Sequence, residues 1–155
     1  MIHQKKTMKS MMTMMNDQHI RTYSELMELT TFEERFRYLK LEANVGDATF
    51  GFDRYLNQQF YRSSEWKRLR NEIILRDNAC DLGIPDRELD KRIIIHHMNP
   101  INKNDLIHQT DFLLNPEYLI CTCHKTHLAI HYGSEDLLEP AIVERSKNDT
   151  CPWRR

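Results

Sequence analysis

Hydrophobic residues recur at helical spacing in the first part of the chain. Phe32, Phe36 and Leu39 lie three or four positions apart, and Thr31 precedes them as the first residue of a capping-box pattern. This pattern predicts a helix that begins after Thr31 and continues toward Gly46.

Two more helical stretches follow. The residues from Thr49 to Tyr61 carry aromatic side chains at helical spacing, which favours packing in a core over stacking on bases. A third helix is expected to begin after Ser63 or Ser64, either of which can cap it, and to end near Arg76. Its apolar stripe consists of Trp66, Leu69, Ile73 and Ile74.

The pattern then changes from helix to strand. The β-branched run from Arg92 to Ile95 predicts a buried strand, and Asn99-Pro100 ends it because proline has no N–H to donate. Residues 118–122 predict a second short strand. Between the strands, a short helix is expected around residues 105–110.

Histidines gather around these two strands. Six of the eight histidines lie between Ile93 and Gly133. His96 and His97 follow the first strand directly, and neighbouring side chains on a strand point to opposite faces, so the two rings can do different jobs. His108 fits a solvated surface position better than a ligand position.

The last predicted helix carries a second pair of histidines. It is expected to cover residues 123–132, with Thr122 as its N-cap and Gly133 as its C-terminal stop. His127 and His131 are four residues apart and share one helix face, so both can bind one metal ion. His124 lies within a turn of His127 and is a competing ligand.

This arrangement resembles the HNH nucleases of the ββα-metal group, and the surrounding chain, from Tyr55-Leu56-Asn57-Gln58 to Asn148-Asp149-Thr150-Cys151-Pro152-Trp153, is similar to phage-encoded members. The resemblance is carried by His96-His97, by Cys123-His124-Lys125-Thr126-His127 and by His131. It implies that His96, His127 and His131 bind the metal ion and that His97 is the general base.

The resemblance also implies a supporting asparagine before the second strand. The position expected from the family spacing holds Tyr118, and the nearest asparagine is Asn115, to which we assign the catalytic supporting role. Whether Asn115 or Tyr118 fills this position is left open.

Many HNH proteins hold a separate zinc ion with two C-x-x-C pairs, and both pairs are incomplete here. The second cysteine of each pair would stand three positions after the first. Gly83 occupies that position after Cys80, and Thr126 occupies it after Cys123. A structural zinc needs four Cys or His ligands, so we expect none. The expected cofactor is one divalent ion, zinc, nickel, manganese or magnesium, and three imidazoles suit zinc or nickel better than magnesium.

The predicted fold class is α+β. N-terminal helices pack on a small ββα-metal module that contains a two-stranded antiparallel sheet. Residues 1–21 are predicted to form a flexible, Met-rich leader, with a partner-binding helix as the alternative. Residues 22–155 are predicted to form a single domain, with a helical part (22–78), the ββα-metal module (79–133) and a C-terminal tail (134–155).

The charge balance limits how the chain can bind DNA. The net charge of the 155 residues is −1, so affinity for nucleic acid has to come from a local patch and from the metal ion. Lys67, Arg68 and Arg70 lie off the apolar stripe of the third helix. They are either DNA phosphate contacts or part of a solvated face.

Further patterns narrow the class of protein. No secretory signal and no apolar run of about 20 residues is visible, which predicts a cytoplasmic protein, in the host cell if phage-encoded, with no membrane partner. No phosphate-binding loop motif is present, so no nucleotide cofactor is expected.

The predicted function is that of an enzyme, a metal-dependent HNH endonuclease that hydrolyses DNA phosphodiester bonds. The phage resemblance implies a link to genome packaging, with a phage terminase as a candidate partner. The alternative is a non-catalytic, zinc-stabilised module that binds DNA or acts beside a partner nuclease.

Overall fold

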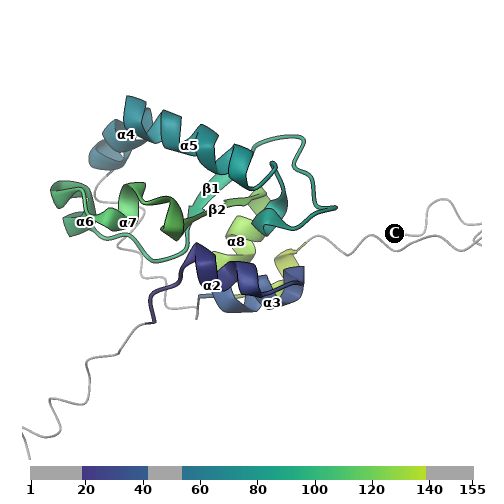
Figure 1. Ribbon diagram of the computed structural model, residues 1–155. Coiled ribbons are helices and arrows are strands. Elements are labelled where there is room, and N and C mark those ends of the chain that lie inside the picture. Colours follow the sequence, from purple (N-terminus) through teal and green to yellow (C-terminus); the bar gives the residue numbers. More distant parts are fainter. Residues whose placement is uncertain (1–18, 42–53, 139–155) are drawn as a thin grey trace, which may run out of the picture.

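A two-stranded sheet lies between two groups of helices in the computed structural model, which describes residues 19–41 and 54–138 (Figure 1). Strand β1 (Ile94–His97) pairs antiparallel with β2 (Leu119–Thr122), and His97 lies opposite Leu119. The structure therefore confirms the α+β class and the antiparallel sheet that the sequence predicted.

Helices α4 (Arg54–Arg62) and α5 (Ser64–Arg76) cover one face of the sheet. The Ser63 hydroxyl accepts the backbone N–H of Trp66 at 3.2 Å, as expected for an N-cap. The part of the predicted second helix before residue 54 lies outside the described residues. A core between α5 and the sheet consists of Trp66, Leu69, Ile73, Ile95, Leu119 and Cys121.

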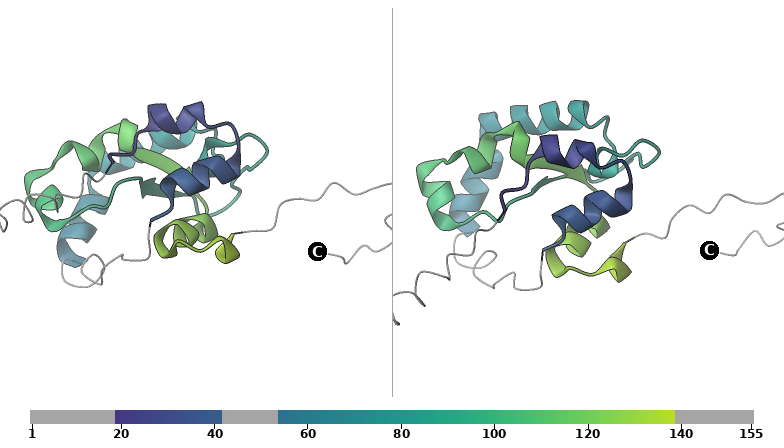
Figure 2. Two further views of the ribbon diagram at one scale, coloured as in Figure 1. Left: turned by 90° about the horizontal axis from the view of Figure 1, so that it is seen from below. Right: turned by 60° about the horizontal axis from the view of Figure 1, so that its bottom comes forward.

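Helices α2 (Tyr23–Glu28), α3 (Phe32–Leu39) and α8 (His124–Tyr132) lie on the other face. The predicted capping box of α3 is present, because Thr31 and Glu34 bond each other reciprocally. This helix ends at Leu39 rather than near Gly46, and residues 42–46 lie outside the described part. Directly after α3, the Leu41 N–H donates to the Ile130 carbonyl at 3.1 Å, so α3 and α8 lie side by side (Figure 2).

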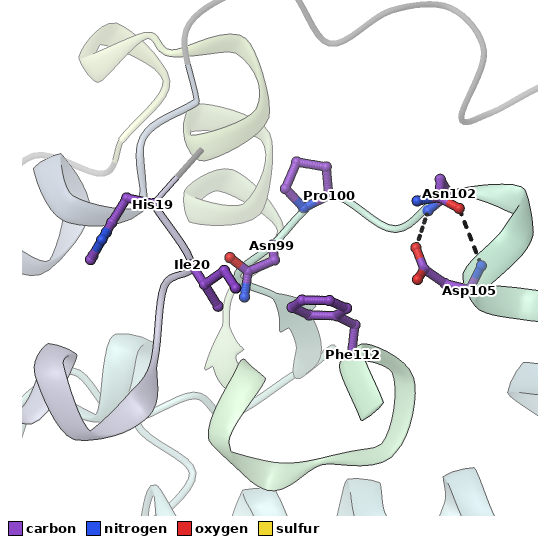
Figure 3. A pocket seen from close by; sticks show the side chains of 7 residues that line it. All are labelled: His19, Ile20, Asn99, Pro100, Asn102, Asp105 and Phe112. Carbon is purple, nitrogen blue, oxygen red and sulfur yellow. Dashed lines mark hydrogen bonds between the residues drawn. The ribbon is translucent and has the colours of Figure 1, made fainter. Parts of the chain in front are cut away.

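Short elements complete the fold. They are α6 (Lys103–His108), α7 (Asp111–Leu114) and the 3-10 turns η2 (Asp81–Gly83), η3 (Pro116–Tyr118) and η4 (Glu135–Leu137). Of these, α6, α7 and η3 connect β1 to β2, η2 lies between α5 and β1, and η4 follows α8. Helix α6 begins before the predicted residue 105 because Asn102 caps it. The Asn102 side chain accepts from the Asp105 N–H, and the Asp105 carboxylate accepts from the Asn102 N–H (Figure 3).

Two further predicted boundaries, both next to the histidines, were wrong by one or two residues. Strand β1 includes His96 and His97, because both continue the ladder with β2. The N-cap of α8 is Cys123, whose Sγ accepts the Thr126 N–H at 3.3 Å, and Thr122 is instead the last residue of β2. The predicted stop is confirmed, since Gly133 ends α8 with a positive φ of 64°.

The C-terminal end of α5 is tied to β2 by hydrogen bonds from Arg76 and to Asp77, two residues that also form an ion pair with each other. The Asp77 carboxylate receives the Arg76 guanidinium at 2.8 Å and the Cys121 N–H at 2.9 Å. Arg76 also donates to the Leu119 carbonyl at 2.7 Å. Because the Asp77 side chain is buried, breaking its bonds would leave a charge without compensation, so these contacts fix β2 relative to α5.

Among residues 19–41 and 54–138, no helix combines the length and the apolar character needed to cross a lipid bilayer.

Candidate metal centre

Three histidines from two elements come together beside the sheet. His96 lies on β1, and His127 and His131 lie on α8. One nitrogen from each ring can be chosen so that all three lie within 4.8 Å of one another. The structure therefore brings together the three residues that the sequence predicted as metal ligands.

The local fold explains this meeting. Side chains alternate along β1, so Ile95 packs in the core beneath α5 while His96 faces the opposite side, toward α8. The one-turn spacing of His127 and His131 places both rings next to His96, with ring centroids 5.3 and 5.1 Å from the His96 ring.

The nitrogens fit a metal ion. His96 is 1% exposed, and its Nε2 has no hydrogen-bond partner in the part of the chain that the structure describes, a costly state for a buried polar atom. The Nε2 atoms of His127 and His131 lie 3.2 Å apart. Two nitrogens bound to one tetrahedral zinc ion are about 3.3 Å apart, given Zn–N bonds of about 2.0–2.1 Å.

The rings are held in the neutral form that binds metals. Burial lowers the pKa of His96 well below its usual value and lowers the pKa of His127 to about 4, with neighbouring histidines adding to both effects. Burial also lowers the pKa of His131. The cluster includes no carboxylate, so a bound divalent ion would keep its full charge and attract an anionic ligand.

His97 lies on the other face of β1, against α5. Its Nε2 lies 3.2 Å from the Leu113 carbonyl oxygen, and its ring stacks on Trp66. A carbonyl only accepts, so the neutral ring carries its proton on Nε2 and its lone pair on Nδ1. Burial lowers the pKa of His97 to about 4, against which the Leu113 bond raises it. Nδ1 is therefore the nitrogen that can accept a proton, and the low pKa keeps it unprotonated at neutral pH while making it a weaker base than a free imidazole.

Asn115 has a contact that shapes the backbone. Its side-chain oxygen accepts the Glu117 N–H at 3.0 Å and so caps the turn η3 that leads into β2. Leu113, whose carbonyl oxygen accepts the hydrogen bond from His97 Nε2, lies two residues before Asn115. Tyr118, the other residue considered for the supporting position, accepts a hydrogen bond from the Met98 N–H through its backbone carbonyl at 2.9 Å.

The three predicted DNA contacts do not share one environment. Lys67 and Arg68 are exposed on α5. Arg70 is half-buried and donates to the Ile93 carbonyl at 3.0 Å, so it ties α5 to the start of β1. His108 and His124 are both exposed, and His124 lies outside the ligand cluster.

The residues of the two incomplete C-x-x-C pairs take part in hydrogen bonds. The buried Asp81 carboxylate accepts the Thr126 hydroxyl and, at 3.2 Å, the Cys123 N–H. Burial raises the pKa of Asp81, against which these bonds lower it. The Cys80 thiol donates to the Asn78 carbonyl at 3.4 Å. The absence of a structural zinc stays a prediction.

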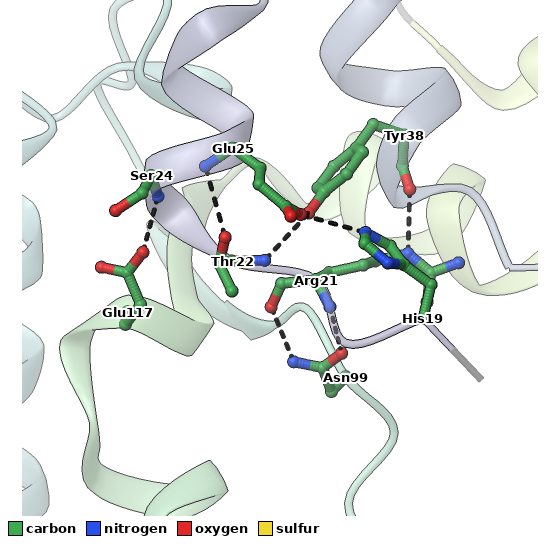
Figure 4. Close-up of polar contacts among 8 residues, drawn as sticks. All are labelled: His19, Arg21, Thr22, Ser24, Glu25, Tyr38, Asn99 and Glu117. Atoms are coloured by element: carbon green, nitrogen blue, oxygen red, sulfur yellow. Dashed lines mark hydrogen bonds and ion pairs between the residues drawn. The ribbon is translucent and has the colours of Figure 1, made fainter. Parts of the chain in front are cut away.

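The sequence did not predict the contact between Arg21 and Asn99, a residue that follows β1 and the candidate ligand His96. The Asn99 amide oxygen accepts the Arg21 N–H at 2.8 Å, and its amide nitrogen donates to the Arg21 carbonyl at 2.9 Å, although the residues are 78 positions apart (Figure 4). The Arg21 charge also contributes to the lowered pKa of His96. Arg21 belongs to the predicted leader, and nothing in its local sequence pointed to Asn99.

The comparisons with known proteins bring no match for this chain. No family model, no curated protein and no solved structure matches it. What the chain does must therefore be argued from the metal centre and its surroundings.

Proposed function

We propose that this protein is a metal-dependent endonuclease of the HNH type that hydrolyses phosphodiester bonds in DNA. The observation that carries the proposal is the cluster of His96, His127 and His131, together with His97, which directly follows His96 and whose Nε2 lies 3.2 Å from the Leu113 carbonyl oxygen. The sequence resemblance to HNH nucleases supports the same reading of these four residues.

The four histidines divide the chemistry. His96, His127 and His131 would hold the ion, which when bound supplies a positive charge that stabilises the charge on phosphate and on the leaving oxygen. His97 takes a proton from the attacking water at Nδ1, and the Leu113 carbonyl keeps the Nε2 proton in place during the reaction.

The charges around the cluster favour an anionic substrate. The ligand set brings no negative charge, and the Arg21 charge acts on His96. A phosphodiester supplies the missing negative charge. Lys67 and Arg68 on the exposed side of α5 would contact further phosphates. The phage resemblance extends the proposal to genome packaging with a terminase as partner, which copurification would test.

Plasmid cleavage tests the proposal. Supercoiled DNA is incubated with the metal-stripped protein after addition of Mg²⁺, Mn²⁺, Ni²⁺ or Zn²⁺, with EDTA as the control. We expect nicked or linear DNA with 5′-phosphate ends in at least one metal and none with EDTA. A protein that binds metal and DNA but cuts in no metal would contradict the proposal.

The second candidate is a non-catalytic module that a zinc ion stabilises. The packing of His97 against Trp66 favours it, because a histidine that serves only the core shows the same contact. In that case His97→Ala lowers stability and leaves any DNA cleavage by a partner nuclease unchanged. If the protein is the enzyme, His97→Ala removes cleavage by the purified protein.

A further inference from the structure

Three aromatic side chains of α4 and α5 form a cluster next to His97. They are Phe60, Tyr61 and Trp66. The Phe60 and Tyr61 rings lie 5.1 and 5.2 Å from the Trp66 ring, measured between centroids. Trp66 is 5% exposed and belongs to the core between α5 and the sheet, so its position is set by helix packing.

The indole of Trp66 covers one face of the His97 ring. The two ring planes are 15° apart with centroids 5.4 Å apart, an offset-stacked geometry. The Phe60 ring lies beside them, 6.3 Å from the His97 ring and tilted by 48°. Trp66 is therefore the member of the cluster that sets the plane of the imidazole.

Two independent contacts fix the His97 ring. The stack on Trp66 sets its plane, and the bond from Nε2 to the Leu113 carbonyl, at 3.2 Å, sets its rotation within that plane. Either contact alone would leave one side-chain rotation free. Together they leave one orientation of the ring and hence one direction for the Nδ1 lone pair.

We propose that Trp66 is a positioning residue for His97, holding the imidazole in the single orientation in which Nδ1 can take a proton from the attacking water. This inference rests on the proposed function and adds a residue that touches neither metal nor DNA. It also makes the helical part of the chain necessary for catalysis, because Trp66 reaches His97 only when α5 is packed on the sheet.

Kinetics of two Trp66 variants test the proposal. Trp66→Phe keeps an aromatic face and Trp66→Leu removes it. Leu69→Ala is the matched control, because Leu69 lies one turn away in the same core and is 7% exposed. We measure the melting temperature, the affinity for Mn²⁺, and kcat and KM for plasmid cleavage.

The expected result separates positioning from stability. Trp66→Leu should lower kcat by about tenfold to 100-fold while KM and metal affinity change less than about threefold, since a small misplacement of a catalytic group has that scale. Trp66→Phe should recover most of kcat. Leu69→Ala should lower the melting temperature with kcat unchanged. Equal kcat losses in Trp66→Leu and Leu69→Ala would overturn the proposal.

A measurement without DNA keeps the test independent of the enzyme activity. In NMR spectra of the metal-free protein, the His97 ring protons should be shifted upfield by the indole, and Nε2 should carry the proton. Trp66→Leu should remove the upfield shift. If the leucine variant does not fold, the same measurement is made on Trp66→Met. His97 ring shifts unaffected by either change would overturn the positioning role, whereas a wild-type protein that cuts no DNA contradicts the proposed function instead.

Discussion

The chemistry of the candidate centre rests on single nitrogen atoms. His96 contributes a buried Nε2 without a hydrogen-bond partner among the described residues, and the His127 and His131 nitrogens lie 3.2 Å apart. Neutral imidazoles repel each other only weakly. Binding of a cation would stabilise this arrangement of nitrogens far more than the imidazoles do by themselves.

Removal of single ligands should be visible in metal affinity. His127→Ala and His131→Ala should each weaken binding by about 100-fold or more, because losing a ligand costs at least as much as losing its supporting contacts. His124→Ala is the control on the same helix, with an exposed ring, and should bind metal normally. Calorimetric titration with Zn²⁺ and Ni²⁺ measures this. If His124→Ala abolishes binding and His131→Ala does not, the ligand set is wrong by one helical turn.

At the scale of elements, the start of α8 is bonded to η2. Asp81 on η2 accepts bonds from the Thr126 hydroxyl and the Cys123 N–H at the first turn of α8. This turn sets the direction of α8, and with it the positions of His127 and His131.

Loss of the Thr126 hydroxyl should destabilise the fold, while the remaining bond from the Cys123 N–H to Asp81 should keep the start of α8 in place and the metal content unchanged. Thr126→Val keeps the shape but leaves the buried Asp81 carboxylate short of one donor, which costs about 1–3 kcal/mol. Thr30→Val, at an exposed position, should change stability little. Urea unfolding and elemental analysis measure the two effects. A second, cysteine-bound metal in the wild-type protein would contradict the account of this region.

The exposed basic residues of α5 are predicted to contact DNA phosphates. Lys67→Ala combined with Arg68→Ala should weaken binding to all DNA sequences about equally and flatten the salt dependence by up to about two units of slope. Arg70→Ala should instead lower stability, because Arg70 bonds the Ile93 carbonyl. Arg37→Ala, exposed on α3, is the control for general charge loss. An unchanged slope in the double variant would make this face a solvated one.

At the scale of the whole molecule, the predictable features are those with local signals. A serine at 63 or 64 predicted the start of α5, and the one-turn spacing of His127 and His131 predicted that both rings share one face of α8. The bond between Asn99 and Arg21, 78 positions apart, has no local signal. The stack of Trp66 on His97 is likewise fixed only by the packing of α5 on the sheet, so sequence periodicity could show Trp66 as core but not as a neighbour of His97.

The buried histidines predict how the metal-free fold responds to acid. Burial lowers the pKa of His97 and of His127 to about 4, below the value of about 6.5 in an unfolded chain. Between these values the unfolded chain binds more protons, so stability falls as the pH falls from about 6.5 toward 4. Because both rings are partly exposed, we expect a loss of about 1 kcal/mol for each ring between pH 7 and pH 5.

Urea unfolding in EDTA at pH 7, 6 and 5 measures this response. His127→Gln removes one of the titrating histidines and should flatten the curve, although it also changes stability at pH 7. A wild-type stability that is constant from pH 7 to pH 5 would mean that the histidines are solvated, and that the centre is more open than the structure indicates.

The most direct test of the account compares metal binding and DNA cleavage in His97→Ala and the wild-type protein. We predict that both bind one divalent ion per chain with similar affinity, because His97 lies outside the ligand cluster. We predict that His97→Ala cleaves plasmid DNA about 10²–10⁴-fold more slowly, the scale for losing a general base. Cleavage by His97→Ala at the wild-type rate, or a wild-type protein that binds no metal ion, would contradict the account.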